Sequence, residues 1–170
     1  MPTGHLWVAA RHVEFAIEIT PPPLRVLDIG CGFGKYGVLL REYISTHPQI
    51  DGCEAWEGYV EPMRLRGIYS ELHVCDALDL PTEVLDRYDL INMGDVIEHM
   101  RKKPALEFLT RCKGHVLINT PVNFFHNPAD LPHTEEHVSH WTLADFQSTG
   151  RLIRHEEYLG GHLALLGPLP

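Results

Sequence analysis

Residues Arg25–Leu40 read RVLDIGCGFGKYGVLL, and this stretch decides the fold class of the chain. Its first part, 26–29, is an apolar run of the kind that forms a buried parallel strand. Asp28 lies inside that run, and a buried carboxylate is costly unless it is paired. The run ends in three alternating glycines, Gly30, Gly32 and Gly34. They let the backbone turn sharply and approach a ligand, and the helical stretch that follows places that ligand at a helix N-terminus.

Strand-like and helical stretches alternate along the rest of the chain. The expected strands span residues 25–30, 50–55, 69–75, 88–93, 114–120, 152–158 and 161–166. The expected helices span residues 5–19, 34–46, 58–66, 82–86, 96–100, 104–112 and 143–148. This alternation predicts an α/β fold with a seven-stranded, mostly parallel sheet and helices on both faces. Ligands of such sheets bind at the carboxyl ends of the strands.

The length of the chain fits a single domain over residues 1–170. We expect an N-terminal helix within residues 1–20, stopped by the prolines 21–23, and a polar loop over 121–140. No apolar run approaches the ~20 residues that cross a bilayer, so membrane insertion is not expected. The N-terminus lacks the pattern of a secretory signal, and the four cysteines show no CxxC spacing. These features predict a cytoplasmic protein with free thiols.

The sequence D-I-G-C-G-F-G at residues 28–34 resembles the first motif of the class I S-adenosylmethionine-dependent methyltransferases, and later landmarks of that family follow in order. The resemblance implies the Rossmann-like fold of that class, with an antiparallel closing hairpin around Gly160-Gly161. It implies S-adenosylmethionine as the cofactor. The turn, including Cys31, would surround the methionine part, and Asp28 would hold the amino group directly or through water.

Acidic residues end or follow the next two strands. Glu54 ends the second strand about 20 residues after the turn, where an acidic residue can accept hydrogen bonds from both ribose hydroxyls. It could instead begin the next helix. Asp76, after the third strand, resembles the family residue that meets the adenine amino group, and an N-cap role would also explain it. The resemblance adds Ala55 and the backbone N–H of Ala77 as neighbouring contacts.

A dinucleotide-binding oxidoreductase is the rival interpretation of the turn. Gly32, Gly34 and Gly37 match the GxGxxG fingerprint of NAD-binding proteins, a weak pattern when it stands alone. Gly30 at the strand end and Asp28 within the strand favour S-adenosylmethionine. The chain also shows no Ser/Tyr/Lys or Cys-based redox constellation that would support hydride transfer.

The segment 88–100 (YDLINMGDVIEHM) resembles the fourth-strand motif of the family, where Gly94 and Asp95 lie beside the methionine or ribose. Asp95, Glu98 and His99 are spaced i, i+3, i+4, so on a helix they share one face. That face could bind a divalent metal or present a general base. A capping box, with Asp95 as N-cap and Glu98 reaching back, explains the same spacing without chemistry.

A histidine-rich stretch follows the fifth strand. Its histidines are His126, His133, His137 and His140. With the upstream Glu-His segment and the Trp141-Thr142 pair, it resembles the small-RNA 2′-O-methyltransferases, in which two acidic residues and two histidines hold magnesium or manganese. Carried over by position, the ligands are Asp95, Glu98, His99 and His137. Asp95 replaces the usual glutamate of that family, and this donor set also suits iron or zinc.

Methyl transfer to a hydroxyl requires loss of a proton, which calls for a histidine base or a metal that lowers the pKa of the hydroxyl. His99 and His137 are the first candidates for the base. Asn123, Phe124 and Phe125 could line the acceptor pocket or belong to the core.

We therefore predict an S-adenosylmethionine-dependent methyltransferase that acts on a hydroxyl, with nitrogen as second choice. The net charge of −9 argues against nucleic acid and for a small-molecule, glycan or lipid-linked acceptor. An open acceptor site would suit a large substrate or a second copy of the chain as a homodimer. A non-catalytic S-adenosylmethionine-binding module that serves a partner enzyme is the alternative from another class.

Overall fold

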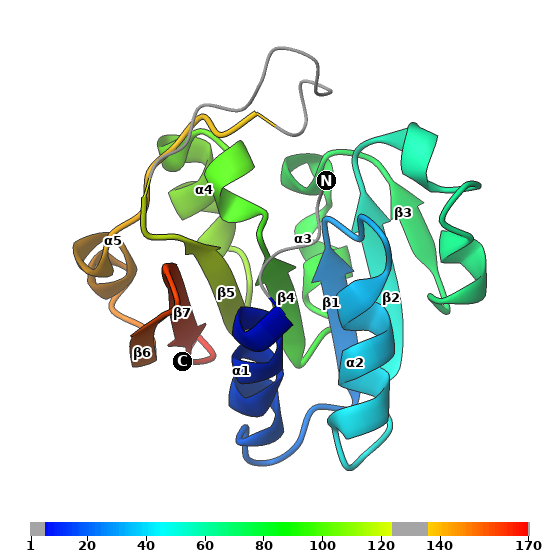
Figure 1. The fold of residues 1–170 in the computed structure, drawn as a ribbon, viewed down its shortest axis with the longest axis horizontal. Coiled ribbons are helices and arrows are strands. Elements are labelled where there is room, and N and C mark those ends of the chain that lie inside the picture. Colours follow the sequence, from blue (N-terminus) through cyan, green and yellow to red (C-terminus); the bar gives the residue numbers. More distant parts are fainter. Residues whose placement is uncertain (1–5, 124–135, 170) are drawn as a thin grey trace.

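A seven-stranded sheet forms the centre of the computed structural model, which describes residues 6–123 and 136–169 (Figure 1). Its strands are β1 (Arg25–Ile29), β2 (Gln49–Glu54), β3 (Leu72–Val74), β4 (Leu90–Gly94), β5 (His115–Pro121), β6 (Leu152–Tyr158) and β7 (Gly161–Leu166). Their order in the sheet is β3-β2-β1-β4-β5-β7-β6. Strands β1 to β5 pair in parallel, whereas β7 is antiparallel to both β5 and β6. The predicted mostly parallel sheet and its closing hairpin are confirmed.

Helices cover both faces of this sheet, as the alternation of elements predicts. They are α1 (Leu6–Ile17), α2 (Lys35–Tyr43), α3 (Thr82–Leu85), α4 (Lys102–Leu109) and α5 (Leu143–Ser148). Helices α1 and α2 pack on one face, in front of the sheet in Figure 1, and α3, α4 and α5 contribute to the core on the other. Neighbouring residues of β1 alternate between the two cores: Val26 faces α1 and α2, and Leu27 the opposite layer.

Two expected helices are wrong. Residues 58–66 form turns between two short 3₁₀ segments, η1 (Glu57–Tyr59) and η2 (Leu65–Gly67), because Pro62 would remove a hydrogen bond and clash inside an α-helix. Residues 96–100 form only the 3₁₀ turn η4 (Ile97–His99). A further 3₁₀ turn, η3 (Ala77–Asp79), follows β3, which is itself shorter than predicted.

Among the described residues, no helix has the length and apolar character that crossing a membrane would require. The four cysteines are free thiols, as predicted, with Cys31, Cys53 and Cys112 buried and Cys75 half-buried.

Candidate active site

A cleft of about 440 Å³ opens where β1, β2, β3 and β4 reach their carboxyl ends. Its lining includes most of the predicted cofactor residues: Gly30, Gly32, Glu54, Ala55, Asp76, Ala77 and Asp95. His99 also lines it, at the side formed by η4 and the start of α4. Four predicted cofactor residues, Asp28, Cys31, Gly34 and Gly94, are not among the lining residues. The cleft therefore lies where ligands of open α/β sheets bind.

The glycine turn has a backbone shape that only glycine adopts easily. Gly30, Gly32 and Gly34 have φ angles of 68°, 51° and 75°. The Gly30 N–H donates to the Cys53 carbonyl at 2.8 Å, which ties the turn to the end of β2. A Cβ on Gly30 would overlap Cγ2 of Val96, another residue of the cleft wall. The turn thus brings its bare backbone to the cleft.

Glu54 connects this turn to the end of β2. Its Oε2 accepts a hydrogen bond from the Gly32 N–H at 2.9 Å, and its Oε1 accepts one from the Trp56 N–H at 2.8 Å. A carboxylate has about four acceptor positions, so these two hydrogen bonds do not use all of them. The side chain is buried and lines the cleft. Its predicted role with the ribose stays a prediction.

Asp76 has the capping role that the sequence left open. Its Oδ1 accepts a hydrogen bond from the Leu78 N–H at 2.9 Å and caps η3. The residue is exposed and lines the cleft beside Ala77. Capping uses one carboxylate oxygen, so the predicted contact with an adenine amino group remains compatible with it.

Asp28 lies beneath the turn rather than in the cleft wall. Both of its carboxylate oxygens accept hydrogen bonds, from the Tyr69 hydroxyl at 2.5 Å and from the Asn92 amide at 2.7 Å. Asn92 in turn accepts from His12 Nε2 at 2.6 Å. Sequence reasoning missed Tyr69 and His12, which belong to no recognisable short motif, and it gave no role to Asn92 within the segment 88–100. The contact of Asp28 with the cofactor amino group stays a prediction.

Asp95 does not form the capping box considered from its spacing. Its φ of 58° places it in the left-handed region, and the N-cap of η4 is Val96, whose side chain makes no capping hydrogen bond. Its Oδ1 accepts a hydrogen bond from the Asn119 amide at 2.7 Å, and Lys35 Nζ lies 3.7 Å from its Oδ2. Burial raises the pKa of the Asp95 carboxyl, and the Lys35 cation opposes that rise.

Three of the four predicted metal ligands come together. One ligand atom from each of Glu98, His99 and His137 lies within 4.8 Å of the others, and Asp95 is outside this group. The His99 and His137 rings meet edge to face with centroids 4.9 Å apart. Glu98 is buried, and its Oε2 has no hydrogen-bond partner among the described residues. Burial together with Asp95 raises the pKa of its carboxyl to about 8. The four-ligand set stays a prediction; the structure brings three of its members together, and the Asp95 carboxylate contacts Asn119 and Lys35 instead.

Backbone hydrogen bonds between the residues after His137 and Glu98 place His137 in this group. The N–H groups of Val138 and Ser139 donate to the Glu98 carbonyl at 2.9 and 3.0 Å. The buried Trp141 indole donates to the Ile97 carbonyl at 3.2 Å. A capping box formed by Thr142 and Asp145 begins α5.

The remaining candidates stand apart from the three-residue group. His140 is exposed, with Nε2 2.7 Å from the Val122 carbonyl, and Asn123 is exposed as well. Phe124, Phe125, His126 and His133 lie outside the described residues.

The fold and the cleft define a Rossmann-like protein with a nucleoside-cofactor site. Bare glycine backbone, the acceptors Glu54 and Asp76, and the small side chains of Ala55 and Ala77 suit S-adenosylmethionine. A family model described as a methyltransferase domain matches residues 7–164, so the chain belongs to the class I S-adenosylmethionine-dependent methyltransferases. The expected enzyme class and cofactor are thereby confirmed, and the NAD interpretation is set aside.

Solved structures share the fold at low sequence identity. The N-terminal domain of EvdMO1, solved in the presence of SAH and D-fucose, has a TM-score of 0.66 at 14% identity over 99% of this chain and 85% of that chain. The mitomycin 7-O-methyltransferase MmcR has a TM-score of 0.65 at 14% identity over 96% of this chain and 54% of that chain. An O-methyltransferase family protein from Burkholderia thailandensis has a TM-score of 0.63 at 12% identity, covering 95% and 56%. No curated protein matches the chain.

Proposed function

We propose that this methyltransferase transfers its methyl group to a hydroxyl of a small-molecule, glycan or lipid-linked acceptor, with nitrogen as the second choice of atom. The observation that carries the proposal is the group Glu98, His99 and His137 at the edge of the cofactor cleft. A hydroxyl, unlike a free amine, must lose a proton to become a strong nucleophile, and imidazole is the commonest side chain for that task.

The roles of the residues follow from their positions. S-adenosylmethionine, when bound, supplies a methyl group on a positively charged sulfur. Glu54 and Asp76 would accept hydrogen bonds from its nucleoside part at the ends of β2 and β3. His99, which lines the cleft, or His137 beside it would accept the proton of the acceptor hydroxyl. Backbone hydrogen bonds to the Glu98 carbonyl hold the two rings together, so little reorganisation is needed.

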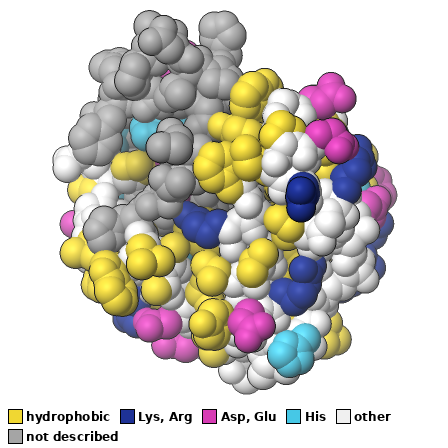
Figure 2. Space-filling model, turned by 45° about the vertical axis from the view of Figure 1, so that its right-hand side comes forward, with side chains coloured by type: hydrophobic (Ala, Val, Ile, Leu, Met, Phe, Trp, Pro, Cys, Tyr) yellow, Lys and Arg dark blue, Asp and Glu magenta, His cyan; other side chains and the backbone are white. Residues whose placement is uncertain are grey.

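Surface charge supports an acceptor other than nucleic acid. Figure 2 shows the face that includes the right-hand side of Figure 1, where Lys and Arg side chains are scattered among hydrophobic and acidic ones. The described part of that face carries no continuous basic patch of the kind that phosphate backbones require. EvdMO1 with D-fucose and the mitomycin 7-O-methyltransferase agree with a small-molecule acceptor.

A panel of acceptors tests this function. The protein is incubated with S-adenosylmethionine and with sugars, phenols, lipid-linked sugars, amines and an RNA oligonucleotide, and S-adenosylhomocysteine formation is measured. We expect turnover with a hydroxyl compound and a methyl ether in the product by mass spectrometry. Methylation confined to RNA would contradict the proposal, and methylation confined to amines would overturn the hydroxyl in favour of its second choice, nitrogen.

A divalent metal bound by Glu98, His99 and His137 is the second candidate for promoting loss of the proton from the acceptor hydroxyl. One carboxylate and two imidazoles form a donor set that manganese, iron or zinc accepts, and within residues 6–123 and 136–169 Glu98 Oε2 has no hydrogen-bond partner. A metal held there would lower the pKa of a hydroxyl bound to it. The chain would contribute the three ligands, and the segment from Glu136 to Ser139 would keep His137 close to the other two.

Metal titration distinguishes three ligands from four. We expect calorimetry with Mn²⁺ to detect binding to the unmodified protein, and Glu98→Gln or His137→Ala to weaken it by at least about tenfold because each removes a ligand. Asp95→Asn should bind Mn²⁺ within about twofold, since Asn119 and Lys35 already engage that carboxylate. Equal losses in all three variants would restore Asp95 as a ligand, and no binding to the unmodified protein would rule out this site for Mn²⁺.

A further inference from the structure

Tyr69 reaches Asp28 through a slot between α2 and β2. Its hydroxyl donates to Asp28 Oδ2 at 2.5 Å, and both side chains are buried. A Cβ added to Gly37 would lie 2.5 Å from Tyr69 Cε1, and a Cβ added to Gly52 would lie 2.8 Å from Tyr69 Cγ. Both distances are too short for a side chain, so the two glycines make the space that the tyrosine ring fills.

Asn92 holds the other side of the same carboxylate. Its amide donates to Asp28 Oδ1 at 2.7 Å, so its own oxygen faces His12 and accepts from His12 Nε2 at 2.6 Å. Burial lowers the pKa of His12 to about 4, so this imidazole is neutral near pH 7. The chain His12–Asn92–Asp28–Tyr69 therefore joins α1, β4, β1 and the segment before β3 inside the protein.

The charge of Asp28 depends on these donors. Burial raises the pKa of its carboxyl to about 6, and Tyr69, Asn92, Lys35 and the Gly37 N–H oppose that rise. The Gly37 N–H belongs to the first turn of α2, where a negative charge is stabilised by the helix dipole. The other titratable groups around the carboxylate are Cys31, Tyr36 and the neutral His12.

We propose that Tyr69 and Asn92 are positioning residues for the cofactor: their hydrogen bonds keep the Asp28 carboxylate beneath the first turn of α2 and so maintain the shape of the turn 30–34. The chain runs from Asp28 into that turn within two residues, and the Cys31 thiol donates back to the Asp28 carbonyl at 3.5 Å. A displaced or neutral Asp28 would loosen both the start of α2 and the turn. The inference concerns cofactor binding alone and does not depend on the acceptor or the base.

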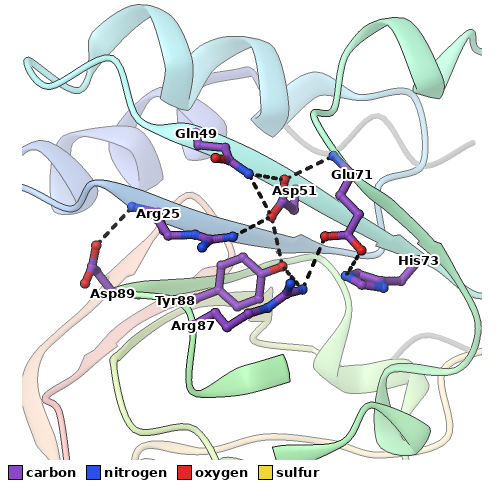
Figure 3. Close-up of polar contacts among 8 residues, drawn as sticks. All are labelled: Arg25, Gln49, Asp51, Glu71, His73, Arg87, Tyr88 and Asp89. Atoms are coloured by element: carbon purple, nitrogen blue, oxygen red, sulfur yellow. Dashed lines mark hydrogen bonds and ion pairs between the residues drawn. The ribbon is translucent and has the colours of Figure 1, made fainter. Parts of the chain in front are cut away.

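A second tyrosine–aspartate pair provides a matched control. Tyr88 donates to Oδ2 of the buried Asp51 at 3.0 Å, within the polar cluster of Figure 3. That cluster also includes contacts of Asp51 with Gln49 and Arg25. None of the residues drawn in Figure 3 lines the cofactor cleft. Tyr88→Phe thus removes a comparable buried hydrogen bond away from the turn.

The test compares Tyr69→Phe with Tyr88→Phe by calorimetry with S-adenosylmethionine across about pH 6 to 8.5. We expect Tyr69→Phe to weaken binding about tenfold near pH 7, as loss of a hydrogen bond to a charged group would, and Tyr88→Phe to change it by less than about twofold. Removing the Tyr69 donor raises the pKa of Asp28 further, so more of its carboxyl is neutral near pH 7. The deficit of Tyr69→Phe should therefore shrink toward pH 8.5 and grow toward pH 6.

Two results would overturn the proposal. One is equal cofactor affinity of the two variants at every pH, and the other is a deficit of Tyr69→Phe that does not change with pH. Thermal unfolding and circular dichroism test whether each of the two variants is folded. Asn92→Ala removes the other donor and must show the same pH-dependent loss, so the proposal stays testable if Tyr69→Phe does not fold. A ¹³C-carboxyl NMR titration of Asp28 provides a readout independent of the ligand.

Discussion

Replacement of Gly30 by alanine is expected to weaken S-adenosylmethionine binding by at least about 100-fold, or about 2.8 kcal/mol. The new Cβ would overlap Cγ2 of Val96, and both residues line the cleft. Relief of the overlap must displace either the glycine turn or Val96, the residue before η4. The positive φ of 68° adds strain for any residue with a side chain. Calorimetry with the cofactor measures the loss directly.

Gly150→Ala separates strain from steric overlap. Gly150 has the same φ of 68°, and a Cβ there would meet no atom of the described residues within 4 Å. It is not among the residues that line the cleft. We expect this variant to lose about 1 kcal/mol of folding stability while it binds the cofactor normally. Binding by Gly30→Ala within about threefold of the unmodified protein would contradict the assignment of this turn to the cofactor.

Replacement of His137 by alanine is expected to reduce kcat by at least about 100-fold with the best acceptor of the panel, the usual effect of removing a general base or a metal ligand. The dissociation constant of S-adenosylmethionine should change by less than about twofold, because His137 is not among the cleft-lining residues. The measurement is S-adenosylhomocysteine production at saturating cofactor, with calorimetry on the same preparations. His99→Ala should show a similar loss of kcat, although this residue lines the cleft and its cofactor affinity requires separate measurement.

His47→Ala is the control for this experiment. His47 is an exposed histidine in the connection between α2 and β2, where β2 begins rather than where the cleft opens. It should retain the activity of the unmodified protein. Unchanged turnover in both His137→Ala and His99→Ala would remove the proposed histidine role. A parallel fall in cofactor affinity and turnover of His137→Ala would instead indicate a structural effect.

Local sequence patterns predict the sheet and the cofactor cleft well. The apolar run before the glycines, and the acidic residues that end or follow the next strands, depend only on neighbours along the chain. Glu54 and Asp76 could therefore be located at the carboxyl ends of their strands without a structure. The resemblance predicts a metal site of Asp95, Glu98, His99 and His137, and the structure brings the last three together while Asp95 lies outside their group.

Contacts between distant residues could not be predicted in this way. Tyr69 lies 41 positions from Asp28, and Asn92 lies 64 positions from it, so no local spacing relates them. Gly37 was considered as part of a dinucleotide fingerprint, whereas its close neighbour is the ring of Tyr69. The helix expected over 96–100 fails for a related reason: Asp95, held by Asn119 and Lys35, turns the chain left-handed where β4 ends.

The slot around Tyr69 also constrains how this protein can evolve. An alanine at position 37 or 52 collides with the ring, so either change is harmful while the tyrosine is present. Loss of the tyrosine would relieve the collision at position 37 and leave Asp28 without one of its donors, whereas a Cβ at position 52 would still lie 2.6 Å from Cys31 Sγ. Positions 37 and 69 are thus epistatic, and in homologous sequences we expect them to covary, with a larger residue at 37 only where 69 is small.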